Sequence, residues 1–344
     1  MRTHQLPVAD RPAVYIIHDN PEWIPPFAKA LAAQGVEFVE WLLPGSTIDL
    51  SAEPPEGIFW SRLSASSHTR TDPHVKDYGR AVLAWLEAAG RTVINGADVY
   101  ELEVSKIRQH RELASRGFDV PRTAAAFGSG ALAEAAADFA PPFITKHNQG
   151  GKGLGVRRFD AQAELDAVIA DFGPGGANEP VDGITLVQEY LQPAEPFITR
   201  AEFIGGRFHY AVAVDVSAGS FELCPADACE IPGAGGAPGT GDTGAPLAQF
   251  TRRESITAET LLIRRLEALL RDLGIDFAGV EFIETADGRQ VVYDINTNTN
   301  YNSAVEEAER AAGRQPAAAR IAKVLADRLG EVTEAPTGAA VPAM

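Results

Sequence analysis

Two short apolar strands near the end of the chain each carry an acidic side chain, and this pair constrains the fold more than any other feature. They cover residues 279–282 and 293–296, and the Asp-Gly pair between them is a strong hairpin-turn signal, so we expect antiparallel neighbours. Side chains alternate along a strand, which places Asp294 and Asn296 on one face, beside Glu281. Mg²⁺ prefers such oxygen ligands and usually completes its shell with water and phosphate oxygens. The hairpin therefore predicts a metal site beside a nucleotide.

The composition is that of a folded acidic protein. The 344 residues are enough for two or three domains, and 45% of them are hydrophobic. Lys and Arg number 30 against 47 Asp and Glu, a net charge of −17 that repels polyanions. We see no uncharged apolar stretch long enough to span a bilayer. We therefore expect a cytoplasmic protein with neither nucleic acid nor membrane as a partner.

From residue 13 to residue 95 the hydrophobic pattern alternates between strand and helix. Predicted strands cover residues 13–17, 36–43, 57–60 and 92–95, and predicted helices cover residues 22–34 and 75–89. This order implies a parallel sheet with right-handed crossovers, in which ligands bind at the carboxyl ends of the strands. We therefore expect pocket residues at His18, Asp19, Arg62 and Ser64. The sequence predicts an α/β domain over residues 11–100.

The rest of the chain mixes strands and helices less regularly. We predict helices over residues 104–115, 131–140, 161–171, 256–273 and 306–329, and strands over residues 142–146, 156–159, 185–190, 197–204 and 207–216. Residues 231–246 are almost all glycine, proline, alanine and threonine, which predicts either a mobile lid or an insertion. Residues 331–344 are predicted to be disordered. Cys224 and Cys229 are too few for a disulfide framework, and we interpret them as structural or incidental thiols.

A glycine-rich loop between two predicted strands is the second candidate site. Lys146 ends the first strand, and the loop carries Gly150, Gly151, Gly153 and Gly155. Walker loops and Rossmann turns lead into a helix, so this loop is neither. Glycines let backbone N–H groups wrap an anion, and a lysine at the end of an apolar strand needs an anionic partner. The loop is either a phosphate-binding loop or a flexible hairpin turn, and Lys146 favours the first.

The order of these features resembles the ATP-grasp ligase superfamily over most of residues 100–325. The features are Lys106 in the helix at 104–115, Lys146 with its glycine loop, the strand at 187–191, Glu281, and the run 294–296. Within the superfamily the chain is similar to glutathione-synthetase-like and ribosomal-protein glutamate ligases. The resemblance implies an α/β (α+β) ATP-grasp fold. It would comprise a Rossmann-like pre-ATP-grasp domain at 11–100, a central subdomain with the glycine flap at 101–190 and a C-terminal subdomain with the metal site at 191–330.

The resemblance also implies two cofactors, ATP and Mg²⁺, and roles for individual side chains. It assigns to the nucleotide Lys106, Lys146, the glycines of residues 150–155, Glu189, Tyr190, Leu191 and Glu195. It assigns to the metal Glu281, Asp294 and Asn296. Two Mg²⁺ ions are expected, with Mn²⁺ as an alternative. Judged alone, Lys106 would be an ordinary solvated lysine of a helix surface, and its weight comes from its place in the order of elements.

The chain departs from the family pattern around the metal strands. The family's usual order is Asp then Glu, whereas here Glu281 precedes Asp294, and position 279, often arginine in related ligases, is glycine. The run after Asn296 reads Thr-Asn-Thr-Asn-Tyr-Asn in place of the usual Pro and Gly. We interpret this run, including Asn298, as shaping the acceptor pocket, with a plain asparagine-rich loop as the alternative.

Two arginines are candidates for binding the reacting groups. Arg200 would stabilise the transferred phosphoryl group or the tetrahedral oxyanion, although it lacks the aspartate that the family often places two residues earlier. A strand-surface arginine without a catalytic role is the competing interpretation. Arg62, together with Ser61 and Ser64, would hold a carboxylate substrate, because a guanidinium group binds a carboxylate through two hydrogen bonds.

These features predict an ATP-dependent carboxylate–amine ligase. The substrate carboxylate would attack the γ-phosphorus of ATP to form an acyl phosphate, and an amine would then displace phosphate. Substrates would be a small-molecule carboxylate and an amine, or a peptide or protein tail, and a homo-oligomer is compatible with the sequence. The alternatives are a small-molecule kinase or a thiol-acceptor ligase on the same scaffold, and a nucleotide-binding regulatory protein without turnover.

Overall fold

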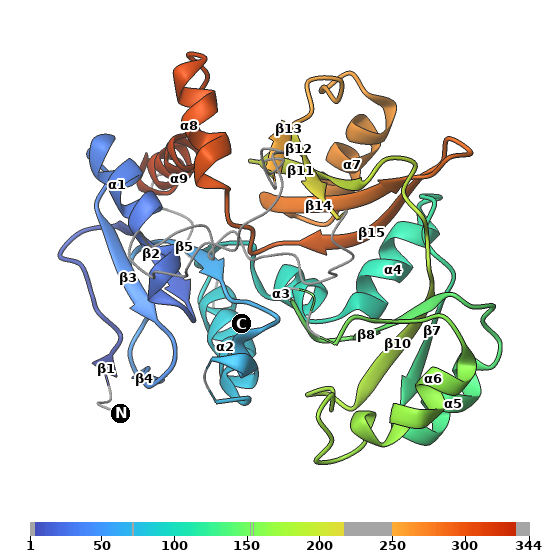
Figure 1. Cartoon of the computed structure of the whole chain (residues 1–344). Coiled ribbons are helices and arrows are strands. Elements are labelled where there is room, and N and C mark those ends of the chain that lie inside the picture. Colours follow the sequence, from blue (N-terminus) through green and yellow to red (C-terminus); the bar gives the residue numbers. More distant parts are fainter. Residues whose placement is uncertain (1–3, 71, 152, 154, 217–249, 335–344) are drawn as a thin grey trace, which may run out of the picture.

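The computed structural model describes residues 4–70, 72–151, 153, 155–216 and 250–334 (Figure 1). Three sheets of four, four and five strands hold most of the described strands, and a two-stranded parallel sheet pairs β1 (His4–Gln5) with β4 (Ser46–Thr47). Among the described residues, no helix combines the length and apolar character needed to cross a bilayer. Cys224, Cys229 and the predicted loop at 231–246 lie outside the described residues.

The N-terminal sheet is parallel, as the alternating pattern predicted. Its order is β3-β2-β5-β6, with β2 at Ala13–His18, β3 at Phe38–Leu42, β5 at Gly57–Arg62 and β6 at Thr92–Ile94. Every residue of β2 and β5 is buried, because helices cover both faces. One face packs on α2 (Val75–Ala88) and α3 (Ala97–Glu103), and the other on α1 (Pro25–Ala33) and α9 (Ala317–Glu334).

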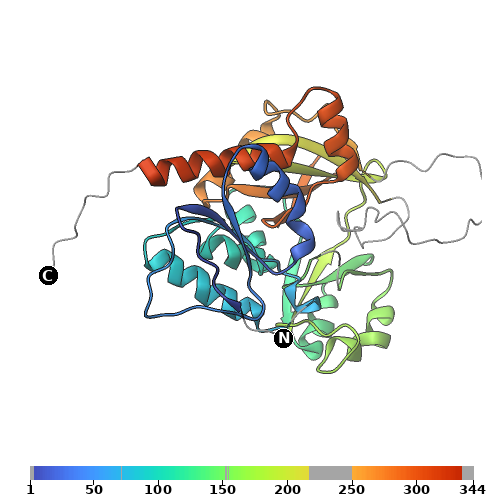
Figure 2. The same ribbon diagram turned by 90° about the vertical axis from the view of Figure 1, so that its left-hand side faces the viewer.

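Helix α9 packs against the N-terminal sheet although it lies near the other end of the chain. It comes from the C-terminal part of the sequence, yet its Ile321 and Leu325 lie in one apolar cluster with Val14 and Ile16 of β2. Figure 2 shows the helix running alongside α1 at this sheet. The N-terminal sheet therefore depends on the last helix for one of its faces.

The second sheet is antiparallel, in the order β7-β10-β8-β9. Its strands are β7 (Thr123–Phe127), β8 (Phe143–His147), β9 (Arg157–Phe159) and β10 (Ile184–Glu189). Helices α5 (Ser129–Ala136) and α6 (Gln162–Val168) pack on it through Leu132 and Leu165. The sequence did not predict β7, whose small side chains give little strand signal.

The third sheet is antiparallel and amphipathic, in the order β13-β12-β11-β14-β15. Its strands are β11 (Phe197–Ile204), β12 (Arg207–Asp215), β13 (Phe250–Arg252), β14 (Phe277–Glu284) and β15 (Gln290–Asn296). Ala201, Phe203 and Val280 face a core formed with α7 (Leu261–Asp272), α3 and α4 (Lys106–Ser115). The residues that alternate with them, including Arg200 and Glu281, face the opposite way and line a cavity.

Several predicted helices differ from the observed ones. The helix expected at 104–115 is α4, which begins at Lys106 because Ser105 is its N-cap and accepts a hydrogen bond from the Arg108 amide. The helix expected from 256 begins at Leu261, after the extended Thr260. The prediction of one helix at 306–329 is wrong, because Gly313 has φ +72° and separates α8 (Ser303–Ala311) from α9.

The predicted disordered tail needs correction at its start. Residues 331–334 form the last turn of α9, so they are helical, contrary to the expectation of disorder from residue 331. Residues 335–344 lie outside the described part of the chain.

Candidate functional site

One cavity of about 280 Å³ lies where the second and third sheets, α4 and the start of the glycine loop meet. Most of the residues predicted for the site line its wall: Ser64, Lys106, Lys146, Gly150, Gly151, Gly153, Glu189, Tyr190, Leu191, Arg200, Glu281, Asp294, Asn296 and Asn298. Among the described wall residues, six predicted members are missing, namely His18, Asp19, Ser61, Arg62, Gly155 and Glu195. Glu195 is exposed on the segment that leads into β11.

The β14–β15 hairpin brings the three predicted metal ligands together. Glu281 is the cross-strand partner of Asp294, and Gly279 is the partner of Asn296. A β-bulge in β15 inserts Tyr293, because Phe282 pairs with Val292 while Glu281 pairs with Asp294. As a result Tyr293 and Asp294, although consecutive, both line the cavity.

The oxygens of this hairpin fit a hard divalent cation such as Mg²⁺. Tyr293 Oη donates to Glu281 Oε2 at 2.8 Å, and Asn296 Oδ1 accepts from the Asn298 amide at 3.1 Å. Within the described residues, no group of three His, Cys, Asp or Glu side chains could hold a metal by itself. Two carboxylates and an amide would therefore leave much of an octahedral shell to water and phosphate oxygens, as Mg²⁺ usually requires.

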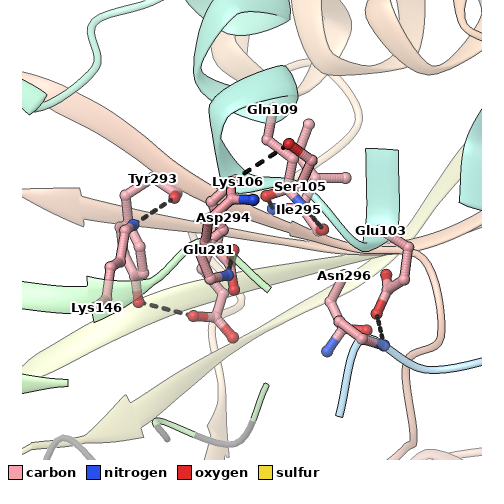
Figure 3. A network of polar contacts seen from close by, with 12 residues as sticks. Glu103, Ser105, Lys106, Gln109, Lys146, Glu281, Tyr293, Asp294, Ile295 and Asn296 are labelled. Carbon is pink, nitrogen blue, oxygen red and sulfur yellow. Dashed lines mark hydrogen bonds and ion pairs between the residues drawn. The ribbon is translucent and has the colours of Figure 1, made fainter. Parts of the chain in front are cut away.

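Two lysines from different elements reach the hairpin (Figure 3), the half-buried Lys106 beside Asp294 and the buried Lys146 beside Tyr293. Lys106, the first residue of α4, forms an ion pair with Asp294 Oδ1. Lys146, on β8, is 7% exposed, and its Nζ lies 3.5 Å from the Tyr293 carbonyl oxygen. Two ammonium groups thus share the neighbourhood of one carboxylate, an arrangement that favours a further anion.

The pKa values reflect this crowding of charge. Burial opposes the charged form of Lys106, but the Asp294 carboxylate more than offsets it and raises the pKa of that lysine. Burial also opposes ionisation of Asp294, but the two lysines hold its pKa below the usual value. Burial and the Lys106 ammonium together lower the pKa of Lys146 to about 8. Burial and the Asp294 charge raise the pKa of Glu281, against the opposing effect of Arg200.

The glycine loop is tied to α4 and to the N-terminal region. Asn148 accepts from the Lys106 amide through its carbonyl at 3.1 Å and from the Ile107 amide through Oδ1 at 3.0 Å. Lys76 Nζ donates to Gln149 Oε1 at 2.6 Å. Gly155 has φ +73°, and a Cβ there would lie 2.3 Å from the His147 ring, so this position requires glycine.

The end of β10 and the residues that follow it line the cavity. Glu189 Oε1 accepts from the Arg122 amide at 2.7 Å, so this carboxylate is engaged with the chain itself. Tyr190 and Leu191 follow it along the cavity wall. Glu189, Tyr190 and Leu191 thus form a continuous stretch of the cavity wall.

Arg200 lies at the centre of a second charged group. Its Nε donates to Glu202 at 2.7 Å, its Nη1 lies 3.3 Å from Glu281 Oε1, and its Nη2 donates to Thr299 Oγ1. The space above Gly279 makes this possible, because a Cβ there would lie 2.8 Å from Arg200 Nε. Arg200 therefore occupies the place where a side chain at position 279 would stand.

Arg62 lies behind the cavity wall. Only 1% exposed, it donates from Nε to Asn298 Oδ1 at 3.1 Å and from Nη2 to the Thr299 carbonyl at 3.1 Å and Asn300 Oδ1 at 2.6 Å. Its guanidinium also lies 4.5 Å from the Phe27 ring centroid. Direct contact between Arg62 and a substrate stays a prediction; the contacts seen position the loop that carries Asn298.

Sequence reasoning missed the polar side chains that hold the end of β15. Glu103 Oε2 accepts from the Thr297 amide at 2.7 Å, and Gln109 exchanges hydrogen bonds with both backbone groups of Ile295 at 2.8 and 3.0 Å. Gln109 sits one helical turn before Leu113 on the buried face of α4, a pattern that could have identified it. Glu202, a buried carboxylate in the cavity wall, was also missed.

Comparisons with known proteins agree with the resemblance seen in the sequence. No protein-family model matches the chain. A probable alpha-L-glutamate ligase of Xanthomonas campestris pv. campestris (strain 8004) is 29% identical over 153 residues, which are 44% of this chain and 50% of that protein. The chain thus matches about half the length of the curated relatives.

Solved structures match over nearly the whole chain. A RimK domain ATP-grasp protein from Sphaerobacter thermophilus has a TM-score of 0.61 at 18% identity and covers 90% of this chain and 98% of its own. The ATP-grasp ligase PsnB, solved with a minimal precursor, Mg and ADP, has a TM-score of 0.59 at 16% identity and covers 92% of this chain and 97% of its own. Identities this low speak to the fold alone. The chain therefore has the ATP-grasp fold, as its motifs predicted.

Proposed function

We propose that this protein is an ATP-dependent, ADP-forming carboxylate–amine ligase. The observation that carries the proposal is the meeting of Lys106, Lys146, Glu281 and Asp294 in one cavity, beside a glycine loop. Two cations and two carboxylates in one wall suit a magnesium-bound polyphosphate, which neutralises the lysines while its metal neutralises the carboxylates. The ATP-grasp fold and the named ligases that resemble the chain support the same activity.

The nucleotide would lie between the second and third sheets. Lys106, Lys146 and the backbone N–H groups of the glycine loop would contact its phosphates. Adenine would lie against residues 189–191, contacted by backbone groups because the Glu189 carboxylate is already engaged. A contact of Glu195 with the ribose remains part of the proposal, although it would require this exposed side chain to turn toward the cavity.

Glu281, Asp294 and Asn296 would hold the metal, expected as two Mg²⁺ ions with Mn²⁺ as an alternative. When bound, the metal would neutralise charge that develops on the phosphate oxygens. Binding requires Lys106 to exchange the Asp294 carboxylate for a phosphate oxygen, and both groups keep an opposite charge beside them through that exchange.

The chemistry requires positioning and charge stabilisation rather than a protein nucleophile. A carboxylate oxygen of the substrate attacks the γ-phosphorus, the bond to the β-phosphate oxygen breaks, and ADP leaves. The amine nitrogen then attacks the acyl carbon, the bond to phosphate breaks, and a proton leaves the nitrogen. Arg200 lies beside Glu281 and is the candidate for stabilising the anionic oxygens in both steps.

We extend the proposal to the domain organisation, the substrates and the cellular location of the protein. We assign residues 11–100, 101–190 and 191–330 to a pre-ATP-grasp domain and two ATP-grasp subdomains, with α9 covering the first of them. The substrates would be small molecules or a peptide tail. A cytoplasmic location and a homo-oligomer remain predictions from the sequence.

A phosphate-release assay tests the activity. The protein, ATP and Mg²⁺ are incubated with a panel of carboxylates, with and without amino acids and dipeptides as amines. We expect ADP and phosphate to appear only when both a carboxylate and an amine are present, with an amide as product. ADP formed with a phosphorylated product and no amine requirement would identify a kinase, a requirement for a thiol would identify the thiol-acceptor ligase, and ATP binding without turnover would identify a regulatory protein.

A further inference from the structure

The cavity continues past Arg200, away from the metal hairpin, along an apolar strip. The strip consists of Val212 and Val214 on β12, Phe250 on β13 and Val305 on α8. Val212 is the cross-strand partner of both Arg200 and Arg252, and Val214 of Phe250. Val212 and Val214 therefore lie two strands from β14, on the same face of the sheet as Arg200.

Glu202 stands at the polar end of this strip. Its carboxylate is 3% exposed and lines the cavity, and its cross-strand partners are Tyr210 on β12 and Gly279 on β14. Oε1 accepts from Arg200 Nε at 2.7 Å, and Oε2 accepts from Thr299 Oγ1 at 3.0 Å. A carboxylate offers about four acceptor directions, so these two donors do not exhaust it.

Gly279 makes room for the Arg200–Glu202 pair. A Cβ at this position would lie 3.0 Å from Glu202 Oε2 and 2.9 Å from Arg200 Nη2. Any larger residue would press on the Arg200–Glu202 pair. The cavity thus has a carboxylate next to the reacting centre and apolar side chains beyond it.

We propose that Glu202 and the apolar strip form the acceptor pocket, and that the acceptor is an amino compound with an apolar side chain. Its ammonium group would bind Glu202 near the acyl phosphate, and its side chain would lie on Val212, Val214 and Val305. This inference rests on the proposed ligase function. It names the amine that the phosphate-release assay would select.

An acidic acceptor fits this pocket poorly. A carboxylate side chain would lose its hydration against the strip without gaining a compensating partner there, which is unfavourable. Arg252, on the neighbouring strand β13, already forms an ion pair with Glu309 at 2.8 Å. The chain should therefore differ in acceptor from the relatives named as probable glutamate ligases.

A purely structural role for Glu202 makes a different prediction. If the carboxylate only positioned Arg200, its loss would disturb acyl-phosphate formation and would slow all acceptors equally. If it binds the ammonium group, its loss would affect cationic acceptors alone. Hydroxylamine separates the two cases, because it is a neutral nucleophile at neutral pH and traps acyl phosphates as hydroxamates.

The experiment compares leucine, glutamate and hydroxylamine as acceptors in the wild-type protein, Glu202→Gln and a control, Glu284→Gln. Glu284 is also a strand carboxylate paired with an arginine, Arg253, but it is not among the described residues that line the cavity. The carboxylate substrate is the one identified by the phosphate-release panel. Thermal melting checks that both variants fold.

We expect wild-type KM to be at least tenfold lower for leucine than for glutamate. Glu202→Gln should raise the KM for leucine about tenfold, which is the expected loss of one charge-assisted contact, while hydroxamate formation changes less than twofold. Glu284→Gln should leave all three acceptors unchanged. Equal losses for leucine and hydroxylamine, or a wild-type preference for glutamate, would overturn the assignment.

Two further measurements test the acceptor pocket and the ligase function separately. If Glu202→Gln does not fold, Val214→Thr replaces a methyl group of the strip with a hydroxyl at nearly constant volume. It should raise the KM for leucine about threefold without changing hydroxamate formation, and an unchanged KM would overturn the pocket. Absence of hydroxamate in the wild-type protein with every carboxylate would instead defeat the ligase function itself.

Discussion

One charged region lines the cavity and another lies behind its wall, and the two are built in opposite ways. At the β14–β15 hairpin, Lys106 pairs with Asp294 and Arg200 with Glu281, so ion pairs face the space where a ligand would lie. Behind the Asn298 loop, Arg62 is 1% exposed and donates to neutral amide and carbonyl oxygens. In the first region, a charged ligand can replace one member of an ion pair. In the second region, any movement of Arg62 would break its hydrogen bonds to the loop.

The difference shows that a charged side chain in the interior can serve either ligand binding or local structure. A charged pair beside a cavity keeps its electrostatic energy when a phosphate or a metal replaces one partner. A buried guanidinium that satisfies several neutral acceptors instead fixes the shape of a loop. We therefore expect mutations in the first region to affect turnover and binding, and mutations in the second to affect stability first.

The largest expected effect is on turnover at the hairpin. Asp294→Ala removes a proposed metal ligand and should lower kcat by about a thousandfold. The fold should persist, because Asp294 faces the cavity and not the apolar core. Asp287→Ala, in the exposed turn of the same hairpin, is the control, and phosphate release measures both. Unchanged activity in Asp294→Ala would sink the metal assignment.

Arg62→Met tests the second region. The substitution leaves Asn298, Asn300 and the Thr299 carbonyl without their donor, so we expect the free energy of unfolding to fall by about 3 kcal/mol. Urea denaturation measures this loss, with the exposed Arg289→Met as control. The nucleotide dissociation constant should stay within a factor of about two. A nucleotide defect without loss of stability would show that the two regions do not differ as described.

Lys146→Met tests the proposed phosphate contact in the first region. The variant keeps much of the side-chain volume but loses the cation, so we expect the dissociation constant for ATP to rise by about thirtyfold, or about 2 kcal/mol. Titration calorimetry measures it, and the exposed Lys323→Met should bind like the wild type. An unchanged constant in Lys146→Met would refute the phosphate contact.

The smallest effect is a pH dependence of nucleotide binding. The pKa of Lys146 is lowered from 10.5 to about 8, so its positive charge is present below this pH and is lost as pH rises through it. A bound phosphate favours the charged form, and the ATP dissociation constant should therefore rise about three- to tenfold between pH 7 and pH 9. In Lys146→Met this rise should disappear. A wild-type constant that does not change over this range would contradict the prediction.

The sequence predicted those parts of the site that depend on local pattern. Strand periodicity and the Asp-Gly turn were enough to place Glu281 opposite Asp294, and the chain order of the motifs pointed to the ATP-grasp fold. The same reasoning could not find the bulge at Tyr293, because a bulge is a property of two paired strands. Nor could it find the hydrogen bond of Arg62 to Asn298, because the two residues lie 236 positions apart in the chain.

By itself the amino-acid sequence determined the parallel N-terminal sheet and the hairpin that carries Glu281 and Asp294, because hydrophobic period and turn preference are local properties. Only the tertiary structure decided that α9 closes the first sheet, that Arg200 fills the space above Gly279, and that Glu202 faces the same cavity as Asp294. Such contacts join residues far apart in the chain. They depend on how three sheets and their helices pack together, and that packing is a balance of buried area and paired charge over the whole molecule.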